Sequence, residues 1–185
     1  MGAVGASRES EAVAQSLPDN GGVYLVPGFT GLGAPFWEAE ARCAIFGLTR
    51  DAGPAHIVRA GLEAMAYQTR DLLDALRADG APEPARLLVD GGVTANGWVM
   101  QFLADLTGVA VERPAYQEMT ALGAAKLAAL GAGLIDSLDQ PASGAPAVWE
   151  PAMPASERER LLAGWDAAVA GCLAQARAGR DRANR

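Results

Sequence analysis

The residues best suited to chemistry in this sequence are two adjacent glycines, Gly91 and Gly92. Arg86–Asp90, just before them, is rich in leucine and predicts a short buried strand. Thr94, just after them, is placed to cap a helix. A strand, a Gly-Gly turn and a helix N-terminus together present unpaired backbone N–H groups and the positive end of a helix dipole, an arrangement that binds phosphate. The alternative is an ordinary strand-to-helix turn that binds nothing.

Several other kinds of site are excluded by counting residues. His56 is the only histidine, which removes multi-histidine metal sites. Lys126 is the only lysine among the 15 basic residues, and it follows no phosphate-binding glycine loop. Cys43 and Cys172 lie far apart and form no CxxC motif. We therefore expect no metal site, and a reducing, cytoplasmic location.

The overall composition indicates a soluble globular protein. The 185 residues suffice for one domain with a hydrophobic core, and half of them are hydrophobic. The net charge of −7 argues against a nucleic acid or an anionic membrane surface as partner. No apolar run is long enough to span a bilayer, and the first 20 residues lack the pattern of a secretory leader.

The elements that must position the glycine turn can be predicted from apolar patterns. Strands are expected at Val23–Val26, Cys43–Leu48 and Val109–Glu112. The loop Phe29–Trp37 (FTGLGAPFW) should be ordered and held by its three aromatics, with a functional role and a structural one equally open.

Helices are predicted on the same grounds. The helix after the glycine turn should bury one face and end at Gly108. That face consists of Val99, Phe102, Leu103 and Leu106. The longest helix should open at Asp51–Pro54, with His56 in its first turn as a cap or facing solvent. Its predicted buried stripe is Val58, Leu62, Met65, Thr69, Leu72 and Leu76.

Two further helices are predicted towards the C-terminus. Met119–Leu130 has a small-residue face around Gly123, which suggests close approach to another backbone. Ser156 and Glu159 are spaced as a capping box that opens the last helix. The predicted organisation is a poorly ordered segment at 1–20, a core with the glycine turn at 21–136, a connecting loop at 137–155, and a C-terminal helix with a frayed tail at 156–185.

Several stretches of the chain resemble the C-terminal part of the FGGY family of carbohydrate kinases. They are Gly21–Trp37, Ala44–Arg50, Ala66–Leu73, Val89–Asn96, Met100–Gly108, Val111–Pro114, Thr120–Ala125 and the tail Trp149–Val169. Within the family, VPGFTGLGAPFW is more similar to glycerol kinases than to xylulose or gluconate kinases. The resemblance covers nearly the whole chain after Asn20, but only the second half of the second domain of these two-domain enzymes.

The resemblance implies an α/β fold, the C-terminal domain of an actin-like (ribonuclease H-like) ATPase, here truncated. It implies ATP or ADP with Mg²⁺ as ligand. Gly92 and Asn96 match nucleotide-contacting residues of the family, and Gly91 is carried over as the partner of Gly92. Asp90 could orient the turn or a magnesium-bound water. No catalytic residue carries over, because the general base and the glycerol site lie upstream in the family.

The expected function is therefore the nucleotide-binding portion of a glycerol kinase, inactive without its N-terminal kinase domain in the same chain or on a partner chain. The alternatives are a stand-alone nucleotide-binding or interaction module, a fragment of another FGGY sugar kinase, or a truncated remnant. Truncation should also expose a strand edge and an apolar face, which predicts self-association such as a homo-oligomer.

Overall fold

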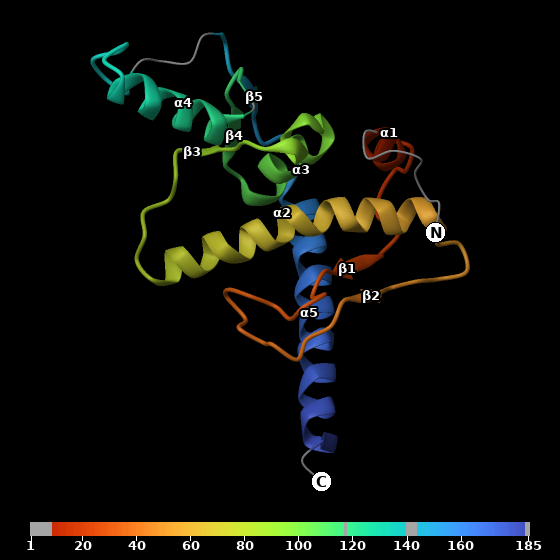
Figure 1. Cartoon of the computed structure of the whole chain (residues 1–185). Helices are drawn as coiled ribbons and strands as arrows, with labels where there is room; N and C mark the ends of the chain where they lie inside the picture. Colours follow the sequence, from red (N-terminus) through yellow and green to blue (C-terminus); the bar gives the residue numbers. More distant parts are fainter. Residues whose placement is uncertain (1–8, 117, 140–143, 184–185) are drawn as a thin grey trace.

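The computed structural model describes residues 9–116, 118–139 and 144–183. The chain begins with α1 (Ser10–Gln15), β1 (Tyr24–Val26), β2 (Ala44–Phe46) and the long helix α2 (Pro54–Ala78). It continues with β3 (Arg86–Leu88), the 3₁₀ turn η2 (Gly92–Ala95), α3 (Gly97–Thr107) and β4 (Ala110–Arg113). It ends with α4 (Met119–Gly131), β5 (Ala147–Trp149) and α5 (Ala155–Ala183) (Figure 1).

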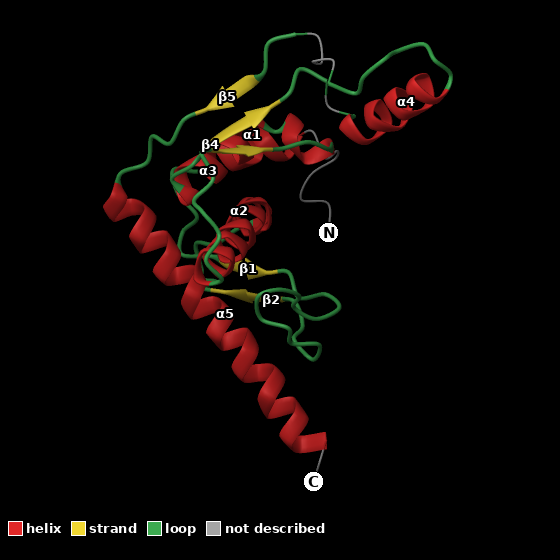
Figure 2. Cartoon of the chain, turned by 90° about the vertical axis from the view of Figure 1, so that its left-hand side faces the viewer, coloured by secondary structure: helices red, strands yellow, loops and turns green. Residues whose placement is uncertain are grey.

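The strands form two small sheets on opposite sides of α2. In one sheet β1 pairs antiparallel with β2, with Leu25 opposite Ile45. In the other, β3 runs parallel to β4 and β5 runs antiparallel to it. Figure 2 shows α2 between the two sheets, with α5 running past the β1–β2 sheet. The strands predicted around residues 23–26, 43–48 and 109–112 are thus confirmed, with slightly different ends.

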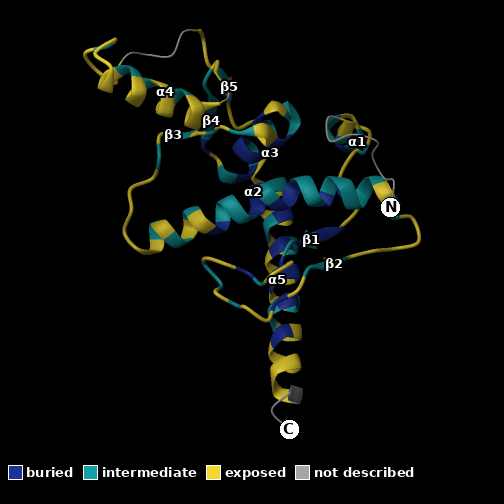
Figure 3. Cartoon of the chain, viewed as in Figure 1, coloured by how far each residue is buried: buried dark blue, intermediate teal, exposed yellow. Residues whose placement is uncertain are grey.

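The core lies where α2, α3, α5 and β1 meet, and aromatic rings join these elements. Tyr67 of α2 stacks on Trp165 of α5 with ring centroids 4.9 Å apart. Phe102 of α3 meets Tyr67 edge-on at 5.7 Å, and Tyr24 of β1 lies at 5.8 Å. All four residues are buried. Figure 3 shows buried stretches on α2, α3, α5 and β1. The predicted inner face of α3 is confirmed, since all four of its residues are buried.

The predicted stripe of α2 is confirmed only in part, since Leu62 and Met65 pack against the core. Leu72 and Leu76 are 43% and 53% exposed, whereas Glu63 and Tyr67 are almost fully buried. The buried side of α2 also carries small residues, which let neighbouring elements approach closely (Ala60, Ala64 and Ala66). The spacing of apolar residues predicted the position of the helix correctly. Which side faces the core depends on the small residues that allow close packing and on polar partners from distant parts of the chain.

The second sheet and α4 are more exposed than the sequence suggested. β3 is an edge strand, with β4 as its partner in the described part of the chain, and Leu88 is 77% exposed. α4 contains no buried residue, and a Cβ on Gly123 would meet no described atom within 4 Å. The expected burial of the strand and the close approach at Gly123 are therefore wrong here. The predicted exposure of a strand edge and an apolar face is confirmed.

The ends of the chain also differ from expectation. The segment 137–155, expected to be a connecting loop, contains β5, which pairs with β4. α5 begins at Ala155, so Ser156 is already helical and the predicted capping box is wrong. The helix continues to Ala183, and Arg180 pairs with Glu38 within the stretch where fraying was expected. The last two residues of the predicted tail, 184–185, lie outside the described residues.

The described part of the N-terminal segment is packed, although poor order was expected over 1–20. Asn20 is fully buried, and the Arg59 guanidinium donates a 2.6 Å hydrogen bond to the carbonyl of Leu17. These polar contacts compensate for the small apolar content of the segment. Residues 1–8 lie outside the described residues.

Candidate functional site

The Gly91-Gly92 turn leaves β3 and faces open space. Gly91 has φ 88° and ψ 173°, a conformation essentially restricted to glycine. Gly92 opens η2, with no positive φ. A Cβ built on either glycine would meet no described atom within 4 Å. The backbone here can therefore be approached closely by a ligand.

The turn presents a row of backbone donors. Thr94 N–H bonds to the carbonyl of Gly91 at 3.1 Å, and Asn96 N–H bonds to that of Val93 at 3.0 Å. Across the described residues, the N–H groups of Gly91, Gly92 and Val93 have no hydrogen-bond acceptor. Consecutive unpaired N–H groups in a turn form a concavity that binds anions.

Asn96, rather than Thr94, caps α3. The Asn96 Oδ1 accepts a 3.0 Å hydrogen bond from Val99 N–H. Thr94 is buried within η2, where its hydroxyl donates to the carbonyl of Gly91 at 2.7 Å. The predicted cap is wrong because the 3₁₀ turn delays the start of α3 to Gly97. Within the described chain the Asn96 amide nitrogen has no acceptor, so it can donate to a ligand.

The N-terminus of α3 is not free to receive an anion, contrary to expectation. The Glu11 carboxylate already accepts a hydrogen bond from Trp98 N–H at 3.0 Å. Phosphate binding would therefore fall to the N–H groups of Gly91–Val93. No local sequence pattern identifies Glu11, because 87 residues separate it from Trp98.

The turn is also held from β4. Arg113 donates a hydrogen bond to the carbonyl of Thr94, and its guanidinium lies 5.3 Å from the ring centroid of Trp149 on β5. At the other end of α3, Gly108 adopts the left-handed conformation of a C-cap, as predicted.

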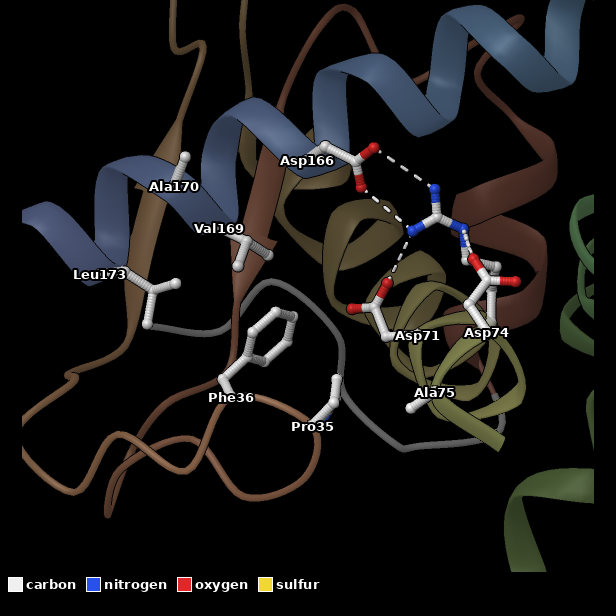
Figure 4. A pocket seen from close by; sticks show the side chains of 10 residues that line it. Pro35, Phe36, Asp71, Asp74, Ala75, Asp166, Val169, Ala170 and Leu173 are labelled. Atoms are coloured by element: carbon white, nitrogen blue, oxygen red, sulfur yellow. Dashed lines mark hydrogen bonds and ion pairs between the residues drawn. The ribbon is translucent and has the colours of Figure 1, made fainter. Parts of the chain in front are cut away.

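A hollow of about 440 Å³ lies between the loop at Pro35–Phe36, α2 and α5 (Figure 4). Arg70 sits at its edge, bonded to Asp71 at 2.8 Å, to Asp74 at 3.0 Å and to Asp166 at 3.1 Å. Because its polar groups already pair with one another, this cluster supports structure rather than chemistry.

Asp71 shows how burial is compensated in that cluster. Its carboxylate accepts a 2.8 Å hydrogen bond from the indole N–H of Trp165. Burial nevertheless raises the pKa of Asp71, against the opposing effect of Trp165 and Arg70. Both partners therefore favour the charged form of Asp71, which burial disfavours.

The aromatics of the Phe29–Trp37 loop do not anchor it as expected. Only Phe36 packs against the core, whereas Phe29 and Trp37 are 71% and 78% exposed. His56 does act as a cap, since its Nδ1 accepts a 3.1 Å hydrogen bond from Gly53 N–H.

No metal site or membrane span emerges from the described residues. They contain no group of three or more His, Cys, Asp or Glu side chains placed to hold a metal ion. Cys43 and Cys172 are both free thiols. None of the helices in these residues combines the length and apolar character needed to cross a bilayer.

Residues 4–132 match the C-terminal domain of the FGGY family of carbohydrate kinases. Two similar curated relatives are the glycerol kinases of Rhodospirillum rubrum and Ectopseudomonas mendocina, which are 55% and 56% identical over 90% and 88% of this chain. These alignments cover 34% and 33% of the relatives, so the chain spans about a third of their length.

The solved structures that the chain resembles are also carbohydrate kinases, and the chain again spans about a third of their length. The crystal structure of Plasmodium falciparum glycerol kinase with ADP aligns with a TM-score of 0.79 and 35% identity, over 92% of this chain and 35% of that one. A xylulose kinase from Rhodospirillum rubrum aligns with a TM-score of 0.71 and 26% identity, over 94% of this chain and 35% of that one.

Proposed function

Because this chain belongs to the FGGY family of carbohydrate kinases, we propose that it is the nucleotide-binding C-terminal portion of a glycerol kinase. Its fold is the α/β C-terminal domain of the actin-like kinases, present in part. The complete enzyme would transfer a phosphoryl group from ATP to glycerol, giving ADP and glycerol 3-phosphate. Glycerol is favoured as acceptor because the chain is 35% identical to the glycerol kinase of known structure and 26% identical to the xylulose kinase.

The row of unpaired N–H groups at Gly91–Val93 is the observation that carries this proposal. These donors would bind the nucleotide phosphates, and the free amide nitrogen of Asn96 would supply one further hydrogen bond. Phosphoryl transfer depends on positioning and charge stabilisation, and Mg²⁺ bound with the nucleotide would neutralise phosphate charge. The exposed Asp90 at the end of this strand could orient that ion or the turn itself.

The catalytic base and the glycerol site would lie in the two-thirds of the enzyme outside this chain. We therefore expect no glycerol-dependent ADP production by the chain alone, and a need for an N-terminal domain in cis or in trans. The free thiols Cys43 and Cys172 support a reducing, cytoplasmic location for the enzyme.

A thermal melt with and without Mg-ADP tests nucleotide binding. At an ADP concentration about 100 times the Kd, binding adds about 2.7 kcal/mol to the free energy of unfolding. For a chain of this size that raises the Tm by roughly 5–11 °C. A Tm that does not move at millimolar ADP would contradict the proposal.

Two substitutions separate binding from folding in that melt. Gly92→Val should abolish the ADP-dependent rise, because its side chain would fill the space before the turn. Asn96→Asp keeps an oxygen to cap α3 but removes the amide donor, so the ADP-dependent rise should shrink while the ligand-free Tm stays near its original value. An unchanged ADP response in both variants would place the nucleotide elsewhere.

A further inference from the structure

We propose that Glu11 is a positioning residue for the nucleotide turn, acting through the backbone N–H of Trp98. This inference rests on the proposed function, since it concerns ADP binding at the same turn. Glu11 lies on α1, outside the Gly91–Val93 turn. Its effect would be exerted on the start of α3, where Asn96 serves both as helix cap and as nucleotide contact.

The first turn of α3 is held by two acceptors in succession. Trp98 N–H donates to the Glu11 carboxylate at 3.0 Å, and Val99 N–H donates to the Asn96 Oδ1 at 3.0 Å. The same Glu11 oxygen would lie 3.3 Å from a Cβ on Gly97, so the carboxylate lies directly against the helix start. A charged acceptor at a helix N-terminus is favoured both by the dipole and by the strength of charge-assisted hydrogen bonds.

Arg59 fixes the same region from the α2 side. Its guanidinium lies 5.1 Å from the centroid of the Trp98 ring. It also donates to the carbonyls of Ala14 and Leu17, which end the α1 segment. Arg59 therefore joins α1, which carries Glu11, to the ring of Trp98. Because Glu11 accepts the Trp98 N–H, Trp98 is restrained at both its backbone and its ring.

Arg59 is itself held by a buried acid. Glu63 is fully buried and accepts a 2.8 Å hydrogen bond from Arg59 Nε and a 3.1 Å bond from Asn20 Nδ2. The chain of contacts thus runs from α2 through Arg59 to the end of α1 and to Trp98, two residues after Asn96.

Two consequences for nucleotide binding follow. First, Glu11 satisfies the N-terminus of α3, so incoming phosphates are directed to Gly91–Val93. Second, Glu11 sets the position of the first turn of α3, and hence of the Asn96 amide that follows η2. Loss of the contact should weaken ADP binding even though Glu11 does not touch the nucleotide.

The experiment is calorimetric titration of the full chain with Mg-ADP, at a temperature where every variant is folded by circular dichroism. Glu11→Ala should raise the Kd for ADP by up to roughly tenfold, which is the loss expected when a displaced Asn96 amide no longer makes its hydrogen bond to the nucleotide. Glu11→Gln retains an oxygen at the same reach and should stay within about twofold of the original Kd. Glu11→Asp keeps the charge but is one methylene shorter, so it should behave like Glu11→Ala.

Ser16→Ala is the matched control on the same segment. It removes a local hydrogen bond to the carbonyl of Val13 and should leave the Kd unchanged. Unchanged or tighter ADP binding by Glu11→Ala would overturn the proposal, as would full affinity in Glu11→Asp. If the unaltered chain does not bind ADP, the proposed function fails and this inference falls with it. If it binds while Glu11→Ala binds equally well, only the positioning role is refuted.

Discussion

Alanine substitutions at Gly91 and Gly92 should separate a conformational role from a binding role within one turn. Gly91 has φ 88° and ψ 173°, and forcing alanine into that region costs about 1–3 kcal/mol. For a chain of this size the Tm of Gly91→Ala should fall by roughly 2–12 °C. Gly92 begins a 3₁₀ turn with no positive φ, so Gly92→Ala should leave the Tm nearly unchanged.

For ADP affinity, Gly92→Ala should be the variant with the clear effect. A Cβ at Gly92 enters the open space in front of the turn, where we propose that the phosphates bind. Gly92→Ala should therefore weaken ADP binding, measured by calorimetric titration, at essentially full stability. Gly61→Ala is a suitable control, because Gly61 lies within α2 in open space and alanine is the better helix former by about 1 kcal/mol.

Two results would refute this reasoning. A Gly91→Ala variant as stable as the original chain would mean that the turn does not require the positive φ. A Gly92→Ala variant that binds ADP with full affinity would mean that no phosphate approaches the turn closely.

Three further predictions concern stability and association. Burial raises the pKa of Glu63 above its ordinary 4.5. The folded state therefore binds a proton on the Glu63 carboxyl more tightly than the unfolded state does. Relative to Glu63→Gln, the original chain should therefore gain stability as the pH falls through the raised pKa towards 4.5, where the unfolded state also takes up the proton. A pH-independent difference in urea unfolding would contradict this. Trp165→Phe removes the 2.8 Å hydrogen bond to Asp71 and should cost about 1.5–3 kcal/mol in the same assay, whereas a cost near zero would show that the bond contributes nothing. Leu88→Lys on the exposed edge strand should reduce self-association measured by light scattering, and an unchanged molecular mass would exclude this edge as the contact.

Much of the local structure could be predicted from the sequence because local interactions decide it. Pro54 opens α2 and His56 caps it within one turn of chain. Gly108 ends α3 in the conformation that glycine adopts most readily. The Gly91-Gly92 pair was identified for the same reason, since a turn between a strand and a helix is encoded over a few residues.

The features that were missed depend on contacts between distant parts of the chain. Glu63 and Asp71 are buried on α2 because Asn20 and Trp165 supply hydrogen bonds from elsewhere, which no helical period reveals. Glu11 reaches α3 across 87 residues.

The burial of β3 in the second sheet was predicted wrongly for a different reason. Leu88 has the composition of a buried strand but remains exposed, and the chain spans only about a third of the length of its relatives. In the proposed full-length enzyme, residues outside this chain would cover β3.

The most direct test of the nucleotide-binding turn is an amide NMR titration of the chain with Mg-ADP. The account predicts that the largest shifts fall on the backbone amides of Gly91, Gly92 and Val93 and on the side-chain amide of Asn96. Saturable binding that leaves these four signals in place, with shifts centred instead on the hollow beside Arg70, would contradict it.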